Sequence, residues 1–132
     1  MIDISPLKKA LATLDRALAA RAKTPDDEFV RDACIQRFEY TYELCHKLLR
    51  RFLEESEPAD TAQLSFPSLI RLAFTRGLLA QSWDSWNDYR EARNNTSHAY
   101  DEAKAAAVLK TLPAFAGEVR FLVDALRARL GQ

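Results

Sequence analysis

The chain is poor in residues that interrupt or cross-link a fold, with three glycines, five prolines and two cysteines among 132 residues. So little glycine and proline argues against an all-β protein, which needs a tight turn about every 8–12 residues. The 19 basic residues cancel the 19 acidic ones, which excludes a histone-like or polybasic nucleic-acid binder. With 48% hydrophobic residues the chain is too apolar to be disordered and predicts one folded domain, residues 1–132.

Long apolar runs and metal or cofactor motifs are missing as well. No segment approaches the roughly 18 uncharged apolar residues of a membrane helix, and the first residues lack the basic and apolar regions of a signal peptide. We therefore expect a cytoplasmic protein with no membrane partner. Cys34 and Cys45 are eleven residues apart in one expected helix, about 16 Å and beyond disulfide reach, and are expected as reduced core residues. Without CxxC, HExxH or a glycine-rich phosphate loop, no metal and no cofactor is expected.

Apolar residues recur at helical spacing through the first half of the chain. Ser5 and Pro6 predict a helix start, with Ser5 as the cap, and the leucine repeat extends that helix over residues 5–22. Residues 24–27 break the pattern and cap a long helix over residues 28–56. The apolar stripe of the long helix is too wide for one seam, which predicts neighbours on several sides and favours a dimer. The stripe comprises Val30, Cys34, Ile35, Phe38, Tyr42, Leu44, Cys45, Leu48, Leu49 and Phe52.

The second half predicts shorter helices followed by another long one. Ten polar, turn-like residues precede Pro67, which opens a short helix that ends before Gly77. A further helix is expected over about residues 82–97. Asp101 caps the last helix, in which Pro113 should produce a kink. The expected fold class is all-α, an up-and-down bundle of four to five antiparallel helices.

The candidate chemistry lies in a polar segment near residue 95. Arg93 and Ser97, like Asn94 and His98, are four residues apart and form one polar ridge on a helix. An arginine fork can hold a phosphate, a histidine can move a proton at neutral pH, and Asn94 can fix the imidazole or bind substrate. The other interpretation is a solvated polar helix end without chemistry.

Arg93 and His98 are not neighbours on an ideal helix. Five residues correspond to about 140° of rotation and 7.5 Å of rise. They converge on one small target only if the helix loosens near Thr96, or if a second chain brings its own copy.

Residues 93–100, RNNTSHAY, resemble the R-x4-H-x-Y signature of HEPN-domain proteins, including the polar residue after the arginine. Residues 37–49 resemble the second-helix signature of one HEPN branch, the nucleotidyltransferase substrate-binding subunits, which are close relatives of the HepT toxins. The likeness spans roughly residues 5–130. His46 departs from it, since this branch has a tryptophan there.

The resemblance implies an up-and-down bundle that forms a two-fold homodimer, in which two motifs face a shared cleft. It implies a metal-independent ribonuclease. The neutral net charge still allows a specific RNA substrate such as a tRNA, and no DNA partner is expected. Arg93 would hold the scissile phosphate, His98 would act as acid–base, Asn94 would orient them and Ser97 would support the group. The implied partner is a minimal nucleotidyltransferase encoded next door, which in such toxin–antitoxin pairs transfers AMP to the tyrosine of H-x-Y, here Tyr100. The AMP group would block RNA by its bulk and negative charge.

Two other functions remain open. One is a non-catalytic subunit that presents substrate to the nucleotidyltransferase through the same cleft. The other is a plain helical interaction protein. The zero net charge counts against a strong general RNA binder, because phosphate contacts supply most non-specific affinity.

The remaining polar candidates on the long helix have structural interpretations. His46 is expected to be packed or at a rim rather than a ligand. The three basic residues within 47–51 are expected on a solvated, ion-paired face rather than along an RNA backbone. Glu39 and Glu43 form an i, i+4 pair, for which helix-surface or dimer-contact roles are preferred over a metal or acid pair.

Four aromatic residues are also more simply structural than functional. Trp83 and Trp86 are expected to anchor a short helix or an interface rather than to stack a base. Tyr40 and Tyr42 are expected as core and interface aromatics.

Overall fold

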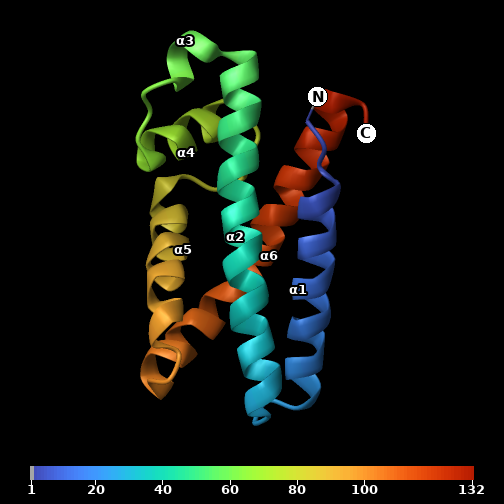
Figure 1. Ribbon diagram of the computed structural model, residues 1–132, viewed down its shortest axis with the longest axis vertical. Coiled ribbons are helices and arrows are strands. Elements are labelled where there is room, and N and C mark those ends of the chain that lie inside the picture. The colour runs from blue at the N-terminus through green and yellow to red at the C-terminus, as the bar shows by residue number, and fades with distance from the viewer. Residues whose placement is uncertain (1) are drawn as a thin grey trace.

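The computed structural model describes residues 2–132, and all its regular elements are helical (Figure 1). Six α-helices and one 3-10 turn follow one another, and the described residues contain no strand, which confirms the all-α helical bundle. No helix within them is both long and apolar enough to cross a membrane. The elements are α1 Ser5–Lys23, α2 Glu28–Ser56, α3 Pro58–Thr61, α4 Phe66–Thr75, α5 Trp83–Asn95, η1 Thr96–His98 and α6 Glu102–Leu130.

The long helix α2 is the centre of the arrangement. In Figure 1, α1 runs antiparallel to it on one side, α5 lies on the other side, and α6 crosses behind α2 from the end of α5 toward the start of α1. The two ends of the chain meet, because the side chain of Gln132 donates a hydrogen bond to the Ile2 carbonyl (2.7 Å). The turn that joins α5 to α6 therefore lies at the far end of the bundle from both termini.

The two long helices begin where the sequence predicts. Asp27 caps α2 by accepting hydrogen bonds from the backbone N–H groups of Phe29 and Val30, and Asp101 caps α6 in the same way. The helix α6 continues through Pro113 to Leu130; the kink expected there remains a prediction.

Two local expectations are wrong. Ser5 is the first residue of α1 and not its cap; the carboxylate of Asp3 instead accepts the Ser5 N–H (2.9 Å), as aspartates do in turns of this kind. The stretch before Pro67 is not all turn, because it contains the short helix α3. Pro58 supplies a preset first-turn backbone angle, and the buried Thr61 hydroxyl donates to the Leu53 carbonyl (3.1 Å).

The apolar stripe of α2 is covered by the chain's own helices. Cys34, Phe38, Cys45 and Leu49 have no exposed surface, and α1, α4, α5 and α6 all contact α2. The expected neighbours on several sides are confirmed, and both cysteines are free and buried. Seven of the ten stripe residues are buried within one chain, and Val30, Leu44 and Leu48 are partly buried, so the exposed patch from which a dimer was expected is largely covered.

A buried carboxylate fixes the start of α5 on α6. Glu118 is 2% exposed and accepts hydrogen bonds from the backbone N–H groups of Ala80 (3.0 Å) and Gln81 (2.9 Å) and from the Trp86 indole (2.9 Å). Trp86 is 1% exposed and packs edge-on against Phe115. This confirms the anchoring role expected for Trp86, and it sets the position of the helix that carries the polar segment.

Candidate functional site

The polar segment lies where α5 ends and the chain turns toward α6. The α-helix stops at Asn95, and Thr96–His98 form the 3-10 turn η1. The Thr96 hydroxyl is buried against this turn and donates to the Arg93 carbonyl (2.7 Å). The helix therefore loosens at Thr96, which is one of the two conditions set by the spacing of Arg93 and His98.

Arg93 is held by two carboxylates from α2. Its Nε donates to Glu43 Oε1 (3.0 Å), and Nη2 lies 3.0 Å from the same oxygen. Nη1 has longer contacts, at 3.6 Å from Glu39 Oε2 and 3.3 Å from Thr96 Oγ1. Glu43 thus occupies the side edge of the guanidinium, while the Nη1 end has weaker partners.

The role of Glu39 and Glu43 was missed by sequence reasoning, which placed them on the helix surface or in a dimer contact. Their i, i+4 spacing puts both carboxylates on one face of α2, and that face meets Arg93 of α5. Two negative charges beside one positive charge leave a local excess of negative charge. A phosphate at Arg93 must compete with at least the more weakly held carboxylate, Glu39.

His98 and Tyr100 form a second part of the site. His98 is half-buried, and its Nδ1 lies 3.4 Å from the Tyr100 hydroxyl, with the two rings edge-on at 6.0 Å. Tyr100 is 83% exposed. A phenol that is this open and adjacent to an imidazole is accessible to a large reagent, and the imidazole can exchange a proton with it.

The structure does not bring all the expected site residues together within one chain. No hydrogen bond or ion pair among residues 2–132 links Arg93 to His98 or the Asn94 side chain to either. Asn94 is exposed, and its backbone carbonyl accepts a hydrogen bond from Ser97 Oγ (3.3 Å). The orienting role of Asn94 and the meeting of two motifs across a dimer axis remain predictions.

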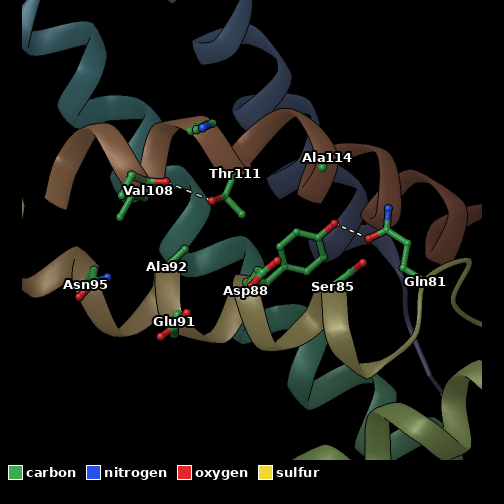
Figure 2. Close-up of a pocket in the computed structure, with 12 residues that line it drawn as sticks. Gln81, Ser85, Asp88, Glu91, Ala92, Asn95, Val108, Thr111 and Ala114 are labelled. Atoms are coloured by element: carbon green, nitrogen blue, oxygen red, sulfur yellow. Dashed lines mark hydrogen bonds between the residues drawn. The ribbon is translucent and has the colours of Figure 1, made fainter. Parts of the chain in front are cut away.

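Two surface clefts flank the turn. One, of about 370 Å³, lies between α2 and η1 beside Tyr100 and shares Glu39 with the Arg93 cluster. The other, of about 410 Å³, lies between α5 and α6 (Figure 2), and Asn95 is the one residue of the 93–100 motif that lines it. The second cleft carries the carboxylates of Asp88 and Glu91 on its α5 side.

The other polar candidates have structural roles. The His46 ring packs edge-on against Phe66 at 4.5 Å, which confirms a packed residue. Among the basic residues of α2, Arg51 pairs with Glu55 at 3.5 Å, as expected for an ion-paired face. Trp83 packs on Phe66 at 5.9 Å.

The two tyrosines of α2 also have structural positions. Tyr42 is a buried core residue, and burial raises its pKa to about 12. Tyr40 is partly exposed, and its hydroxyl shares a hydrogen bond with Thr13 of α1.

Replacement of His46 by phenylalanine should weaken the acid sensitivity of the fold. Burial, and then the positive charge of Arg50, hold the pKa of His46 below its usual value of about 6.5; Arg90 acts in the same direction and Glu43 opposes it. Because the unfolded chain takes up this proton first, the stability contribution is full above about pH 6.5 and is lost as pH falls through the lower folded pKa. Urea unfolding at pH 7.5 and 5.5 measures this. The wild type should lose more unfolding free energy than His46→Phe, and an equal loss would contradict the assignment.

The fold and the turn define a helical-bundle protein with an R-x4-H-x-Y site. The chain matches the family described as nucleotidyltransferase substrate binding protein like over residues 2–128, and it belongs to that family. The resemblance to this HEPN branch is thereby confirmed. The chain is 38% identical over 97 residues to a Haemophilus influenzae protein named "Probable ribonuclease HepT"; the match covers 72% of this chain and 66%, slightly under two thirds, of that relative.

Two solved structures share the fold. One is a Haemophilus influenzae protein whose structure is described as the fold of a substrate binding domain of a nucleotidyltransferase. It has a TM-score of 0.86 and 28% identity, covering 95% of this chain and 99% of that one. The other is a Thermus thermophilus protein with a TM-score of 0.76 and 35% identity, covering 92% of this chain and 98% of that one.

Proposed function

We propose that this chain is the HEPN component of a two-gene toxin–antitoxin pair, a metal-independent ribonuclease that is silenced by its cognate minimal nucleotidyltransferase. The family supports a nucleotidyltransferase partner, and the relative named as a probable ribonuclease supports RNA as the substrate. A cytoplasmic location and an RNA target such as tRNA belong to the same proposal.

The observation that carries the proposal is the break of α5 at Thr96. It takes His98 out of the α-helical register of Arg93 and places its imidazole beside an exposed tyrosine hydroxyl, at 3.4 Å. A merely solvated helix end needs neither a buried threonine that holds the turn nor two carboxylates on one arginine.

In this proposal Arg93 and His98 divide the chemistry. The Nη1 end of Arg93 binds the scissile phosphate in place of Glu39 and stabilises the charge that builds up on its oxygens. His98 takes the proton of the ribose 2′-hydroxyl as its oxygen attacks phosphorus and the bond to the 5′-oxygen breaks. The leaving 5′-oxygen is protonated by His98 of a second copy in a two-fold homodimer, where Asn94 and Ser97 orient the group.

Expression of the chain alone should arrest bacterial growth, and His98→Ala should abolish the arrest because the proton transfer is lost. Growth curves and total RNA integrity measure both effects. His46→Phe is the matched control, since His46 is packed on Phe66 away from the turn, and this variant should still arrest growth. If neither the wild type nor His98→Ala slowed growth, and total RNA stayed intact in both, the ribonuclease proposal would be contradicted.

Tyr100 is the proposed AMP acceptor. Its 83% exposure allows a second protein to reach the hydroxyl, and the adjacent His98 Nδ1 can accept the phenolic proton during transfer. After co-expression with the neighbouring nucleotidyltransferase gene, intact mass should show one or more added AMP groups, and Tyr100→Phe should show none. Tyr40→Phe is the matched control, because Tyr40 is also exposed but lies on α2. Modification that persists in Tyr100→Phe would contradict the assignment.

A non-catalytic substrate-binding subunit is the alternative. The pairing of Arg93 with both Glu39 and Glu43 favours it, since an arginine already neutralised is a poorer phosphate ligand. This function predicts a stable complex with the nucleotidyltransferase, an unmodified Tyr100 and no RNA cleavage without the partner.

A further inference from the structure

The cleft between α2 and η1 has the volume of a small-ligand site and is open to solvent. Its volume of about 370 Å³ falls at the lower end of the roughly 300–1,000 Å³ that is usual for such sites. Residues of α2 form one wall, and the turn that carries the R-x4-H-x-Y motif forms the other. It is lined by Arg31, Asp32, Ile35, Gln36, Glu39, Thr96, Ala99 and Tyr100.

The lining of the cleft includes two apolar side chains. Ile35, which is 4% exposed, contributes a small and fixed contact from α2, and the partly buried Ala99 lines the cleft just after η1. Small apolar surfaces of this kind accept the flat face of a base with little loss of side-chain entropy.

The polar groups of the cleft suit an uncharged nucleoside better than a phosphate. Asp32 and Glu39 supply two carboxylates, and Arg31, the one cation among the described residues that line the cleft, is paired with Asp32 at 3.3 Å. Carboxylates accept hydrogen bonds from ribose hydroxyls but repel phosphate oxygens. The exposed Gln36 amide carries the donor and acceptor that match the N7 and N6 positions of adenine.

Two of the residues that line the cleft adjoin groups that suit a phosphate. Glu39 lines the cleft and also lies 3.6 Å from Arg93, so the guanidinium is next to this part of the lining. Tyr100 lines it as well, and its hydroxyl lies 3.4 Å from His98 Nδ1. A nucleoside in the cleft whose 5′-phosphate is turned toward Tyr100 would place that phosphate at the motif, where the proposed AMP transfer takes place.

We propose that this cleft is an adenosine subsite, which holds the nucleoside part of an AMP group whose phosphate lies at Tyr100 and Arg93. This proposal rests on the proposed function, because the AMP group comes from the proposed transfer to Tyr100. It also explains how the transferred group would block the site. An AMP group bound in this way fills the cleft beside Glu39 and keeps its negative charge next to the arginine, so RNA phosphate is excluded.

The cleft in Figure 2 is less suited to this ligand. It is larger, at about 410 Å³, and it also carries two carboxylates, Asp88 and Glu91, with Lys110 on the α6 side, but Arg93, His98 and Tyr100 are not among its lining residues. In the NMR experiment below, the amides around this second cleft show whether AMP binds there instead of between α2 and η1.

Titration of the full chain with AMP, followed by backbone amide NMR, tests the subsite. AMP should bind saturably and shift the amides of residues 31–39 and 96–100. Ribose 5-phosphate should bind at least tenfold more weakly, because it lacks the base. Gln36→Ala should weaken AMP binding at least fivefold, and Gln63→Ala, an exposed glutamine outside the cleft, should leave it unchanged.

Ribose 5-phosphate that binds as tightly as AMP, unchanged AMP affinity in Gln36→Ala, or shifts confined to the α5–α6 cleft would each overturn the subsite. Thermal unfolding of both glutamine variants checks that they fold. RNA cleavage is measured separately on the unliganded chain. A chain that cleaves RNA without binding AMP overturns the subsite alone, and one that binds AMP but does not cleave RNA overturns the ribonuclease alone.

Discussion

Arg93→Ala is expected to slow RNA cleavage by about 10²–10³-fold, because the charge that develops on the scissile phosphate loses its main electrostatic partner. The fold should survive the change. The ion pairs of Arg93 with Glu39 and Glu43 are partly exposed, and such pairs contribute about 1 kcal/mol or less to stability. Single-turnover cleavage of an RNA substrate, with urea unfolding of the same preparations, measures both quantities.

Arg90→Ala is the matched control for this variant. Arg90 lies about one turn earlier on α5 and packs over the Phe66 ring at 5.7 Å, away from the turn. It should cleave at nearly the wild-type rate. Arg93→Lys should remain strongly impaired, since an ammonium group cannot keep the side-edge contact with Glu43 and bind phosphate at the same time. Full activity of Arg93→Lys would show that charge alone is needed at this position.

Glu118→Ala is expected to lower the free energy of unfolding by about 3–5 kcal/mol. The carboxylate accepts from Ala80 N–H, Gln81 N–H and the Trp86 indole, and its removal leaves the buried indole and two part-buried amides without this partner and opens a cavity at a buried position. A domain of this size has a total stability of about 5–15 kcal/mol, so the variant should be partly unfolded at growth temperature. Urea unfolding at pH 7 measures the change.

Two further variants make the Glu118 prediction specific. Glu54→Ala removes an exposed glutamate of α2 and should change the unfolding free energy by less than about 0.5 kcal/mol. Glu118→Gln should fall between the wild type and Glu118→Ala, since its amide oxygen still accepts while its NH₂ group faces a donor. A loss in Glu118→Ala no larger than that in Glu54→Ala would contradict the anchoring role.

The helices were predictable because their start signals are local. Asp27 and Asp101 act through backbone N–H groups two and three residues ahead, so the sequence alone places α2 and α6. The short helix α3 was not predictable, since it has no apolar periodicity and depends on Thr61 reaching the Leu53 carbonyl, eight residues away.

The candidate site was predictable in part. The angular mismatch of Arg93 and His98 on an ideal helix predicted either a break near Thr96 or a second copy of the motif. The helix breaks at Thr96, but the break does not bring Arg93 and His98 into contact within one chain. The carboxylates that hold Arg93 were not predictable as its partners, because Glu39 and Glu43 lie about fifty residues earlier and meet it only through helix packing. Their i, i+4 spacing indicated only that both carboxylates lie on one face of α2, and it did not identify Arg93 as the partner.

The buried position of Glu118 was easier to predict from the sequence than the partners of Arg93. It lies three residues after Phe115 and four before Leu122, so it falls within the apolar stripe of α6, where a charged residue requires buried partners. The partners themselves come from the segment before α5 and could not be named without the fold.

The most direct test of the account is RNA cleavage by the purified chain in the presence of EDTA. The wild type should cleave and leave 2′,3′-cyclic phosphate ends, because the 2′-oxygen is the nucleophile, and His98→Ala should be slower by about 10²–10⁴-fold. Cleavage that proceeds at the same rate in His98→Ala, or a wild-type chain that leaves RNA intact under these conditions, would contradict the proposed site.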